Sequence, residues 1–420
     1  MARMVEFTST FLQRAKSRGY ISDCTNPNGL DALAKSSSIT GYIGFDATAD
    51  SLHVGSLVPI MLLRLLQQTG HKPIVLVGGG TTKVGDPSGK DESRKLLTEK
   101  DIQSNIDNIK GIFERFLSFG DNPTDAILVN NANWLDNLQY IPFLRDVGRH
   151  FSVNRMLGLD SVKLRLERKQ PLSFLEFNYM IMQAYDFLEL ARNHDCRLQM
   201  GGSDQWGNIV SGIELGRRIE GKELFGLTTH LITTASGSKM GKTADGAVWL
   251  NKERLSPYEY WQFWRNTEDT DVGRFMRLFT ELPDSEIAKY EKLEGEDINE
   301  AKSLLATEAT ALCHGRAAAM AASDSARRTF AEGGIGDDLP CISLRNEELV
   351  DGLPAFVLFT RAGLAKSNSE ARRLIKNGGA KLNDEKINEE LAQITTTDIN
   401  QDGVIKLSAG KKRHALLLIK

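Results

Sequence analysis

The chain has 420 residues, of which 41% are hydrophobic and 25% charged, so a globular protein of two or three domains is expected. No apolar run is long enough for a transmembrane helix, and the N-terminal segment has the pattern of a first helix rather than a targeting signal. The four cysteines, Cys24, Cys196, Cys313 and Cys341, form no CxxC pair. This spacing favours reduced thiols in a cytoplasmic protein and argues against disulfides and a zinc site.

Charge is distributed unevenly along the chain. The net charge is −3, which argues against a general nucleic-acid coat. Residues 353–420 carry 12 Lys and Arg against 7 Asp and Glu, a net +5, so the preceding residues carry −8. A basic module on an acidic body is expected where only part of a surface meets a polyanion, and compositional scatter is the alternative.

The first half of the chain alternates strand and helix patterns. Buried parallel strands are predicted at residues 40–45, 74–77, 126–129, 196–200 and 230–233. The first intervening helix has Asp50 or Ser51 as its N-cap and ends near Gln68, with Pro59 inside it as a potential kink. This alternation predicts a doubly wound α/β domain that binds ligands at the carboxyl ends of its strands.

The second half is predicted to be helical at 257–267 and 298–330, and mixed afterwards. The segment 331–352 contains four glycines, one proline and six acidic residues, which is typical of a linker. The final block combines one helix with short strands and turns. The expected domains are therefore 1–230, 231–330 and 353–420, with a linker at 331–352.

The segment 50–56 lies where a strand leads into a helix, and free N–H groups at a helix N-terminus attract phosphate. His53 adds a hydrogen-bond donor, and Gly55 allows a nucleotide to approach the backbone. A surface or capping histidine is the alternative interpretation.

Two further segments are rich in glycine. In the segment 237–243, Lys239 and Lys242 can converge on one polyphosphate, although an exposed solvated loop is the alternative; Ser236 breaks the Walker A pattern. The segment 78–90 follows a buried strand, but Lys83 stands where the dinucleotide fingerprint requires glycine. A dehydrogenase and a P-loop ATPase are therefore disfavoured.

A helix predicted at 171–194 carries polar residues on one narrow face. Tyr179, Gln183 and Asp186 stand at i, i+4 and i+7, among Phe, Met and Leu neighbours. Buried polar groups need partners, and a polar ligand could supply them. An outward polar stripe is the alternative.

Several segments together resemble a known enzyme family. The segments 53–56 and 239–243 resemble the HIGH and KMSKS signatures of class I aminoacyl-tRNA synthetases. The segments 44–53, 85–90 and 201–208 resemble bacterial-type tyrosyl-tRNA synthetases, and the similarity extends over essentially the whole chain. Departures are Ala47, where proline is frequent, Ser56 for the last histidine of HIGH, and Gly241 and Thr243 for the two serines of KMSKS.

The resemblance implies a Rossmann-like catalytic domain, an α-helical domain and a small α+β S4-like RNA-binding domain. It implies activation of tyrosine with ATP, accompanied by Mg²⁺, followed by transfer to tRNA(Tyr), with no tightly bound cofactor and no protein metal site. A homodimer without membrane contact is expected. Tryptophanyl-tRNA synthetase and a catalytically lapsed RNA-binding relative are the rival interpretations.

The resemblance also assigns residues to these functions. The implied tyrosine-binding residues are Tyr42, Asp86, Tyr179, Gln183, Asp186 and Gln205. The implied ATP-binding residues are Asp46, His53, Gly55, Gly202, Asp204 and Lys242. The implied catalytic residues are Thr48, His53, Lys90, Arg94, Lys239, Lys242 and Thr243. Arg372, Arg373 and Lys376 are expected to contact RNA from one side of a helix.

Overall fold

The computed structural model describes residues 6–88, 97–235, 237, 240–243, 246–330, 341–344, 346–350, 352–399, 404–410 and 413–419. The chain divides into two compact units, residues 1–316 and residues 317–420. No helix within the described ranges is long and apolar enough to cross a membrane.

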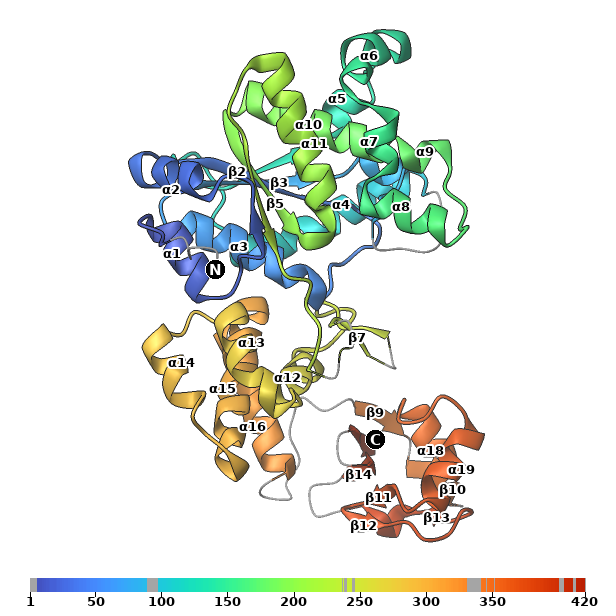
Figure 1. Ribbon diagram of the computed structural model, residues 1–420. Coiled ribbons are helices and arrows are strands. Elements are labelled where there is room, and N and C mark those ends of the chain that lie inside the picture. Colours follow the sequence, from blue (N-terminus) through green and yellow to red (C-terminus); the bar gives the residue numbers. More distant parts are fainter. Residues whose placement is uncertain are drawn as a thin grey trace. The chain divides into compact units, whose positions relative to one another are not determined.

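The first unit is built on a six-stranded sheet (Figure 1). Its strands are β1 (Asp23–Cys24), β2 (Thr40–Phe45), β3 (Lys72–Val77), β4 (Ile127–Asn130), β5 (Cys196–Gly202) and β6 (Phe225–Thr229), in the order β1-β6-β5-β2-β3-β4. Only β1 is antiparallel to its neighbour; all other pairs are parallel. The order runs outward in both directions from the β2–β5 pair, which confirms the predicted doubly wound α/β domain.

Helices cover both faces of this sheet (Figure 1). The helices before the last strand are α1 (Thr10–Ser17), α2 (Pro27–Ser36), α3 (Leu57–Gln68), α4 (Glu99–Phe116), α5 (Ala132–Leu135), α6 (Tyr140–Asp146), α7 (Val153–Leu157), α8 (Asp160–Glu167), α9 (Phe174–Phe177), α10 (Tyr179–Asn193) and α11 (Trp206–Glu220). The helices α3 and α10 lie on opposite faces, and α11 packs beside α10. The core is continuous because eight of the twelve residues of α3 are buried, as are five of the six residues of β3.

Three local predictions need correction. The predicted helix after the first strand begins at Leu57, preceded by a 3₁₀ turn at Val54–Ser56, so Pro59 lies in the first helical turn, where its missing N–H costs no hydrogen bond. The strand predicted at 230–233 is instead β6 at Phe225–Thr229, because its partner β5 ends at Gly202, opposite Thr229. The helix predicted at 171–194 is two helices, α9 and α10, separated at Asn178.

The remaining elements of the first unit are the hairpin β7 (Lys242–Thr243) and β8 (Gly246–Ala247), and the helices α12 (Pro257–Arg265), α13 (Val272–Phe279), α14 (Asp284–Tyr290) and α15 (Ile298–His314). These helices are joined to the sheet region by side chains that donate to backbone carbonyls. Arg18 Nη1 donates to Thr280 O at 2.9 Å, Tyr20 Oη donates to Leu278 O at 2.6 Å, and Arg115 donates to Leu250 O at 3.0 Å. The boundary expected at residue 230 is therefore bridged by direct hydrogen bonds.

The second unit contains α16 (Arg316–Phe330), β9 (Cys341–Leu344), α17 (Asn346–Val350), β10 (Leu353–Pro354), α18 (Ala355–Arg361), α19 (Asn368–Lys376), β11 (Ala380–Leu382), β12 (Glu385–Lys386), β13 (Gln393–Ile394), β14 (Val404–Ala409) and β15 (Arg413–Ile419). Five strands form a sheet in the order β12-β11-β14-β15-β9. It packs against α18 and α19 around a separate core, as expected for an α+β domain. Because β9 and α17 belong to this domain, the linker predicted at 331–352 is wrong for residues 341–350; residues 331–340 lie outside the described part.

The buried face of α4 gives a stability test with neighbouring positions. Ile109 is fully buried, whereas Lys110 is exposed. We expect Ile109→Ala to lower the free energy of unfolding by about 2–5 kcal/mol, because it removes apolar contacts and leaves a cavity. Lys110→Ala should change it by less than about 0.5 kcal/mol. Urea unfolding followed by circular dichroism measures both, and equal midpoints would contradict the described burial of α4.

Candidate active site

A cavity of about 460 Å³ lies at the carboxyl ends of β2 and β5, where the strand order reverses. It gathers most of the predicted site residues, namely Tyr42, Asp46, Thr48, His53, Gly55, Asp86, Tyr179, Gln183, Asp186, Gly202, Asp204 and Gln205. Lys90, Arg94 and Lys239 lie outside the described residues, and Lys242 and Thr243 are described only as the backbone of β7. Ligands of doubly wound sheets bind at such a point, so this cavity is the candidate active site.

The closed end of the cavity contains a buried carboxylate. Asp186 is 2% exposed and accepts hydrogen bonds from Asn131 Nδ2 at 2.9 Å and from Trp134 Nε1 at 2.8 Å. Burial raises the pKa of Asp186 to about 7, while the hydrogen bonds from Asn131 and Trp134 act in the opposite direction. The carboxylate therefore titrates near neutral pH in a site shielded from water.

Tyr42 lies at the same closed end. Its side chain is 1% exposed and packs on Phe187, with ring centroids 5.3 Å apart. Burial, and then the negative charge of Asp186, raise the pKa of Tyr42, so its hydroxyl keeps its proton. Within the described residues this hydroxyl has no hydrogen-bond partner. The closed end thus offers an acceptor and a donor to one polar group of a ligand.

A chain of hydrogen bonds joins the closed end to the middle of the cavity. Asn131 Nδ2 also donates to Thr81 Oγ1 at 3.0 Å, and Thr81 Oγ1 donates to Asp46 Oδ1 at 2.9 Å. Tyr179 Oη donates to the other oxygen of Asp46 at 3.2 Å. Asn131, Trp134 and Thr81 were missed by the sequence prediction. Asn131 lies two residues beyond the strand predicted at 126–129, so the strand-end rule could have found it.

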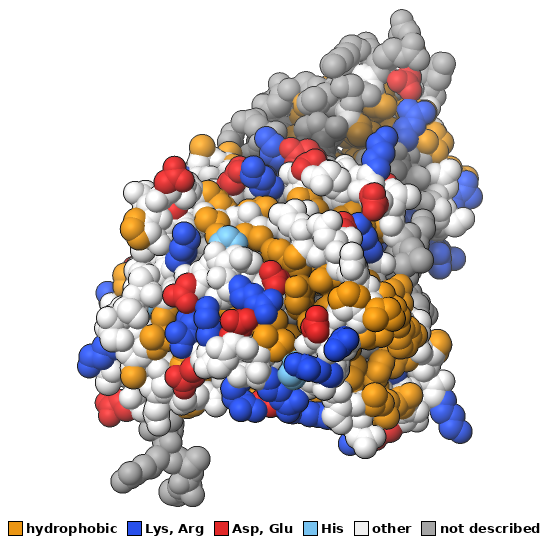
Figure 2. All heavy atoms as spheres, turned by 90° about the horizontal axis from the view of Figure 1, so that it is seen from above, with side chains coloured by type: hydrophobic (Ala, Val, Ile, Leu, Met, Phe, Trp, Pro, Cys, Tyr) orange, Lys and Arg blue, Asp and Glu red, His pale blue; other side chains and the backbone are white. Residues whose placement is uncertain are grey.

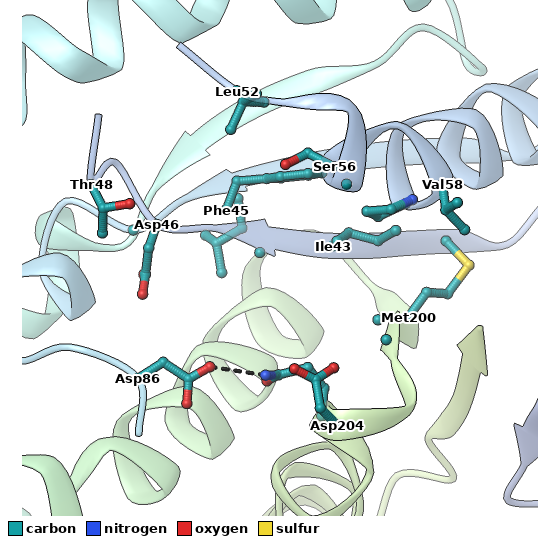
Figure 3. A pocket seen from close by; sticks show the side chains of 18 of the residues that line it. Ile43, Phe45, Asp46, Thr48, Leu52, Ser56, Val58, Asp86, Met200 and Asp204 are labelled. Carbon is teal, nitrogen blue, oxygen red and sulfur yellow. Dashed lines mark hydrogen bonds between the residues drawn. The ribbon is translucent and has the colours of Figure 1, made fainter. Parts of the chain in front are cut away.

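A second polar cluster lies across the cavity from Asp46 and Thr48 (Figure 3). Gln205 Nε2 donates to Asp86 Oδ2 at 2.9 Å, and Gln183 Nε2 donates to Gln205 Oε1 at 3.2 Å. Figure 3 shows Asp86 and Asp204 on the same side of the cavity. Carboxylate and amide oxygens arranged in this way can accept hydrogen bonds from an ammonium group.

The open end of the cavity is formed where β2 leads into α3. His53 Nδ1 accepts a hydrogen bond from the backbone N–H of Gly55 at 3.0 Å, so the proton of the neutral ring is on Nε2. Ser56 precedes the first residue of α3 and also lines the cavity. The positive end of a 12-residue helix therefore faces the site, where it can stabilise a phosphate. No group of three or more His, Cys, Asp or Glu side chains within the described ranges is placed to hold a metal ion.

The predicted RNA-contacting residues lie on α19 of the second unit. Arg373 and Lys376 are exposed, while Ile375 between them is buried. The Arg372 guanidinium lies 4.1 Å from the ring centroid of Phe356 and 3.9 Å from Glu390. The helix therefore presents basic side chains outward and anchors its apolar side in the domain core.

Comparisons with known proteins agree along the whole chain. Residues 34–331 match the family model "tRNA synthetases class I (W and Y)", and residues 332–417 match the model "Tyrosine–tRNA ligase SYY-like C-terminal domain". A tyrosine–tRNA ligase of Rhodospirillum rubrum is 61% identical over 411 residues, 98% of each chain. A tyrosine–tRNA ligase of a Caulobacter species is 60% identical over 417 residues, 99% of each chain.

Solved structures support the same assignment. A C-terminally truncated mitochondrial tyrosyl-tRNA synthetase of Aspergillus nidulans aligns with a TM-score of 0.70 and 31% identity, covering 77% of this chain and 95% of that chain. A tryptophanyl-tRNA synthetase of Plasmodium falciparum shares the fold at a TM-score of 0.53 and 13% identity, covering 76% of this chain and 90% of that one. The chain therefore belongs to the class I tRNA synthetases for tryptophan and tyrosine, and within them to the tyrosyl-tRNA synthetases.

Proposed function

We propose that the protein activates L-tyrosine with ATP, forming tyrosyl-adenylate and pyrophosphate, and transfers tyrosine to the 3′-terminal ribose of tRNA(Tyr). The observation that carries this proposal is the buried pair of Asp186 and Tyr42 at the closed end of a cavity whose open end meets the N-terminus of α3. The relatives that are about 60% identical over the whole chain carry the same function in their names.

The closed end suits a phenol. The substrate hydroxyl donates to Asp186 and accepts from the hydroxyl of Tyr42, which otherwise has no hydrogen-bond partner in the described part of the chain. The α-amino group is held by Asp86, Tyr179 and Gln183, with Gln205 beside them. Phenylalanine would leave the Tyr42 hydroxyl without a partner and would offer no donor to the buried carboxylate of Asp186, which Asn131 and Trp134 would then serve alone. Each lost hydrogen bond of a buried group costs about 1–3 kcal/mol.

The open end suits ATP. A carboxylate oxygen of tyrosine attacks the α-phosphorus, a new O–P bond forms, and the bond to the leaving pyrophosphate breaks. Thr48 and His53, through its Nε2–H, contact the phosphates; Asp46, Gly55, Gly202 and Asp204 contact the rest of the nucleotide. Lys90, Arg94, Lys239, Lys242 and Thr243 are proposed to stabilise the pyrophosphate. Catalysis is then positioning and charge stabilisation, without a covalent enzyme intermediate.

We propose that Mg²⁺ enters with the phosphates of ATP, since this ion is usually bound by one or two carboxylates together with substrate phosphates. The second unit is proposed to bind tRNA through Arg372, Arg373 and Lys376, because the net charge of +5 on residues 353–420 and the outward basic side of α19 suit a phosphate backbone. Charging tRNA for translation places the protein in the cytoplasm.

A homodimer is proposed because exposed apolar side chains gather on one region. Nine of the thirteen large hydrophobic residues found exposed lie between Tyr140 and Leu175, on α6, α7, α8 and α9. Figure 2 shows this concentration of hydrophobic side chains on the side where these helices lie in Figure 1. Apolar patches of this extent are typical of interaction sites, and a second copy of the same chain can cover such a patch symmetrically.

Substrate choice is tested by ATP–pyrophosphate exchange with tyrosine, tryptophan or phenylalanine. We expect exchange with tyrosine and at least about 100-fold lower kcat/KM with phenylalanine, because two buried groups would lose their partner. Exchange driven by tryptophan would contradict the proposal and favour a tryptophanyl-tRNA synthetase. No exchange with any of the three amino acids would favour a catalytically lapsed RNA-binding relative.

The raised pKa of Asp186 predicts a pH dependence of tyrosine binding. The ionised carboxylate accepts the phenol hydrogen bond, so affinity should rise as pH increases through about 7, where Asp186 loses its proton. If only the ionised form binds, the dissociation constant falls about tenfold between pH 6 and pH 8. Equilibrium dialysis measures it, and Asp186→Asn should bind more weakly and without this dependence. An equal pH dependence in both proteins would refute the assignment.

The dimer is tested with charged substitutions in the apolar region. Phe174 and Ile141 are 68% and 69% exposed. Phe174→Asp combined with Ile141→Asp should convert a particle of twice the 46.6-kDa chain mass into a monomer, because buried unpaired carboxylates are costly. Light scattering after size-exclusion chromatography measures the mass. Leu391→Asp, at a 63% exposed site in the other unit, is the control that should leave it unchanged.

A further inference from the structure

The two signature segments of the active site are joined by backbone hydrogen bonds that run through residues 248–250. The N–H of Val54 donates to Val248 O at 2.9 Å, and the N–H of Leu250 donates to Leu52 O at 2.9 Å. The N–H of Val248 in turn donates to Gly241 O at 3.0 Å. The Gly241 backbone is therefore tied, through one intervening segment, to the residues on either side of His53.

Gly241 also lies against His53 and Gly55 themselves. A Cβ atom added to Gly241 would stand 2.9 Å from the nitrogen of Gly55 and 3.0 Å from Nδ1 of His53, distances that real Cβ atoms show rarely or never. The backbone at Gly241 has a φ of +97°, which side-chain-bearing residues seldom adopt. A Cβ on Gly55 would instead stand 2.7 Å from Cε1 and 2.9 Å from Nδ1 of the His53 ring, and only at van der Waals distance, 3.5 Å, from Met240 O. Gly241 thus permits the close backbone contact with residues 53–55, and Gly55 leaves room for the His53 ring.

The atoms that meet Gly241 are those that fix the state of His53. The hydrogen bond from the Gly55 N–H to His53 Nδ1 keeps the ring proton on Nε2 and sets the direction of that N–H in the cavity wall. An atom inserted at Gly241 would press on both partners of this hydrogen bond. The position therefore acts on the ring of His53 without touching a substrate.

We propose that Gly241 is a positioning residue, whose lack of a side chain lets the loop backbone press onto Gly55 and His53 and hold the imidazole in its catalytic tautomer and orientation. This inference rests on the proposed function for its effect on rate, but its structural part does not. The KMSKS signature that this segment resembles has serine at this position, whereas here the glycine backbone itself lies against Gly55 and His53. Since misplacement of a catalytic group by about 1 Å can lower the rate about 100-fold, a Cβ at this position should lower kcat.

The chain supplies a matched control, Gly237, four residues before Gly241. Gly237 lies in the same loop with a φ of +83°, and an added Cβ there meets no described atom within 4 Å. Gly237→Ala and Gly241→Ala therefore introduce the same methyl group at two positive-φ positions, and only the second creates the contact with His53 and Gly55. If either alanine variant fails to fold, Gly237→Asn and Gly241→Asn form the second pair, because asparagine tolerates positive φ better.

The experiment measures tyrosine-dependent ATP–pyrophosphate exchange and, separately, hydrogen–deuterium exchange of the peptides that contain Val54, Gly55 and Val248. We expect Gly241→Ala to lower kcat about 10- to 100-fold, to leave the dissociation constant for tyrosine within about twofold, and to speed deuterium uptake in these peptides. Gly237→Ala should stay within about threefold of the unsubstituted protein in kcat and show unchanged uptake.

The two readouts separate the inference from the proposed function. Equal behaviour of Gly241→Ala and Gly237→Ala in both measurements would overturn the positioning role. An unsubstituted protein without tyrosine-dependent exchange would overturn the proposed function instead, and faster deuterium uptake confined to the Gly241 variant would then still support the packing of Gly241 on His53 and Gly55.

Discussion

Burial of one carboxylate is the constraint on which the active site depends. Placing Asp186 in an apolar interior disfavours its ionised form, and the raised pKa near 7 expresses this cost. The cost is limited because Asn131 and Trp134 both donate to the carboxylate. Each donor serves a different oxygen of Asp186, so either donor alone would leave one oxygen of the buried carboxylate unsatisfied. Asp186 therefore requires α5, which carries Trp134, to lie beside it.

The same constraint extends through the sheet. Asn131 can serve Asp186 only because β4 ends beside β3 and because Thr81 and the backbone N–H of Gly80 engage its remaining polar atoms. Thr81 then orients Asp46, at the end of β2. Groups from three separate strand ends are thereby held in one hydrogen-bonded network, with Asn131 at its centre.

Much of this arrangement could be predicted from sequence, and the parts that could not have a physical reason. The continuous β-branched and leucine run at 74–77 identified β3, because a strand buried on both faces has no polar alternation, and shorter apolar segments alternating with helical ones indicated β2, β4 and β5. The apolar run at 230–233 was wrongly predicted to be a strand, because hydrophobicity does not reveal whether a neighbouring strand is long enough to pair with it. The partner strand β5 ends opposite Thr229, and Leu231 is 53% exposed.

Contacts over long sequence distances were beyond any local pattern. The helical face of Tyr179, Gln183 and Asp186 was visible from its spacing, but the donors that stabilise Asp186 come from a segment about 50 residues earlier. The segment 331–352 looked like a linker because its four glycines, one proline and six acidic residues outweighed apolar residues such as Ile342 and Leu344. Those two residues pack in the C-terminal core, where the parallel pairing with β15 completes the sheet.

The two ends of the cavity differ in how they are built for their proposed ligands: one presents side chains and the other presents backbone. At the proposed phenol end, discrimination requires buried polar groups that only the correct ligand satisfies, so Asp186 is held by hydrogen bonds and Tyr42 by packing on Phe187. At the nucleotide end, a large anionic substrate must approach the backbone, so glycines and a helix N-terminus replace bulky side chains. His53 combines both features: its side chain is proposed to contact the anion, and its ring is oriented by the backbone of Gly55 and lies against Gly241. If Gly241 positions His53 as proposed, the identity of residue 241 matters to catalysis even though glycine contributes no functional group.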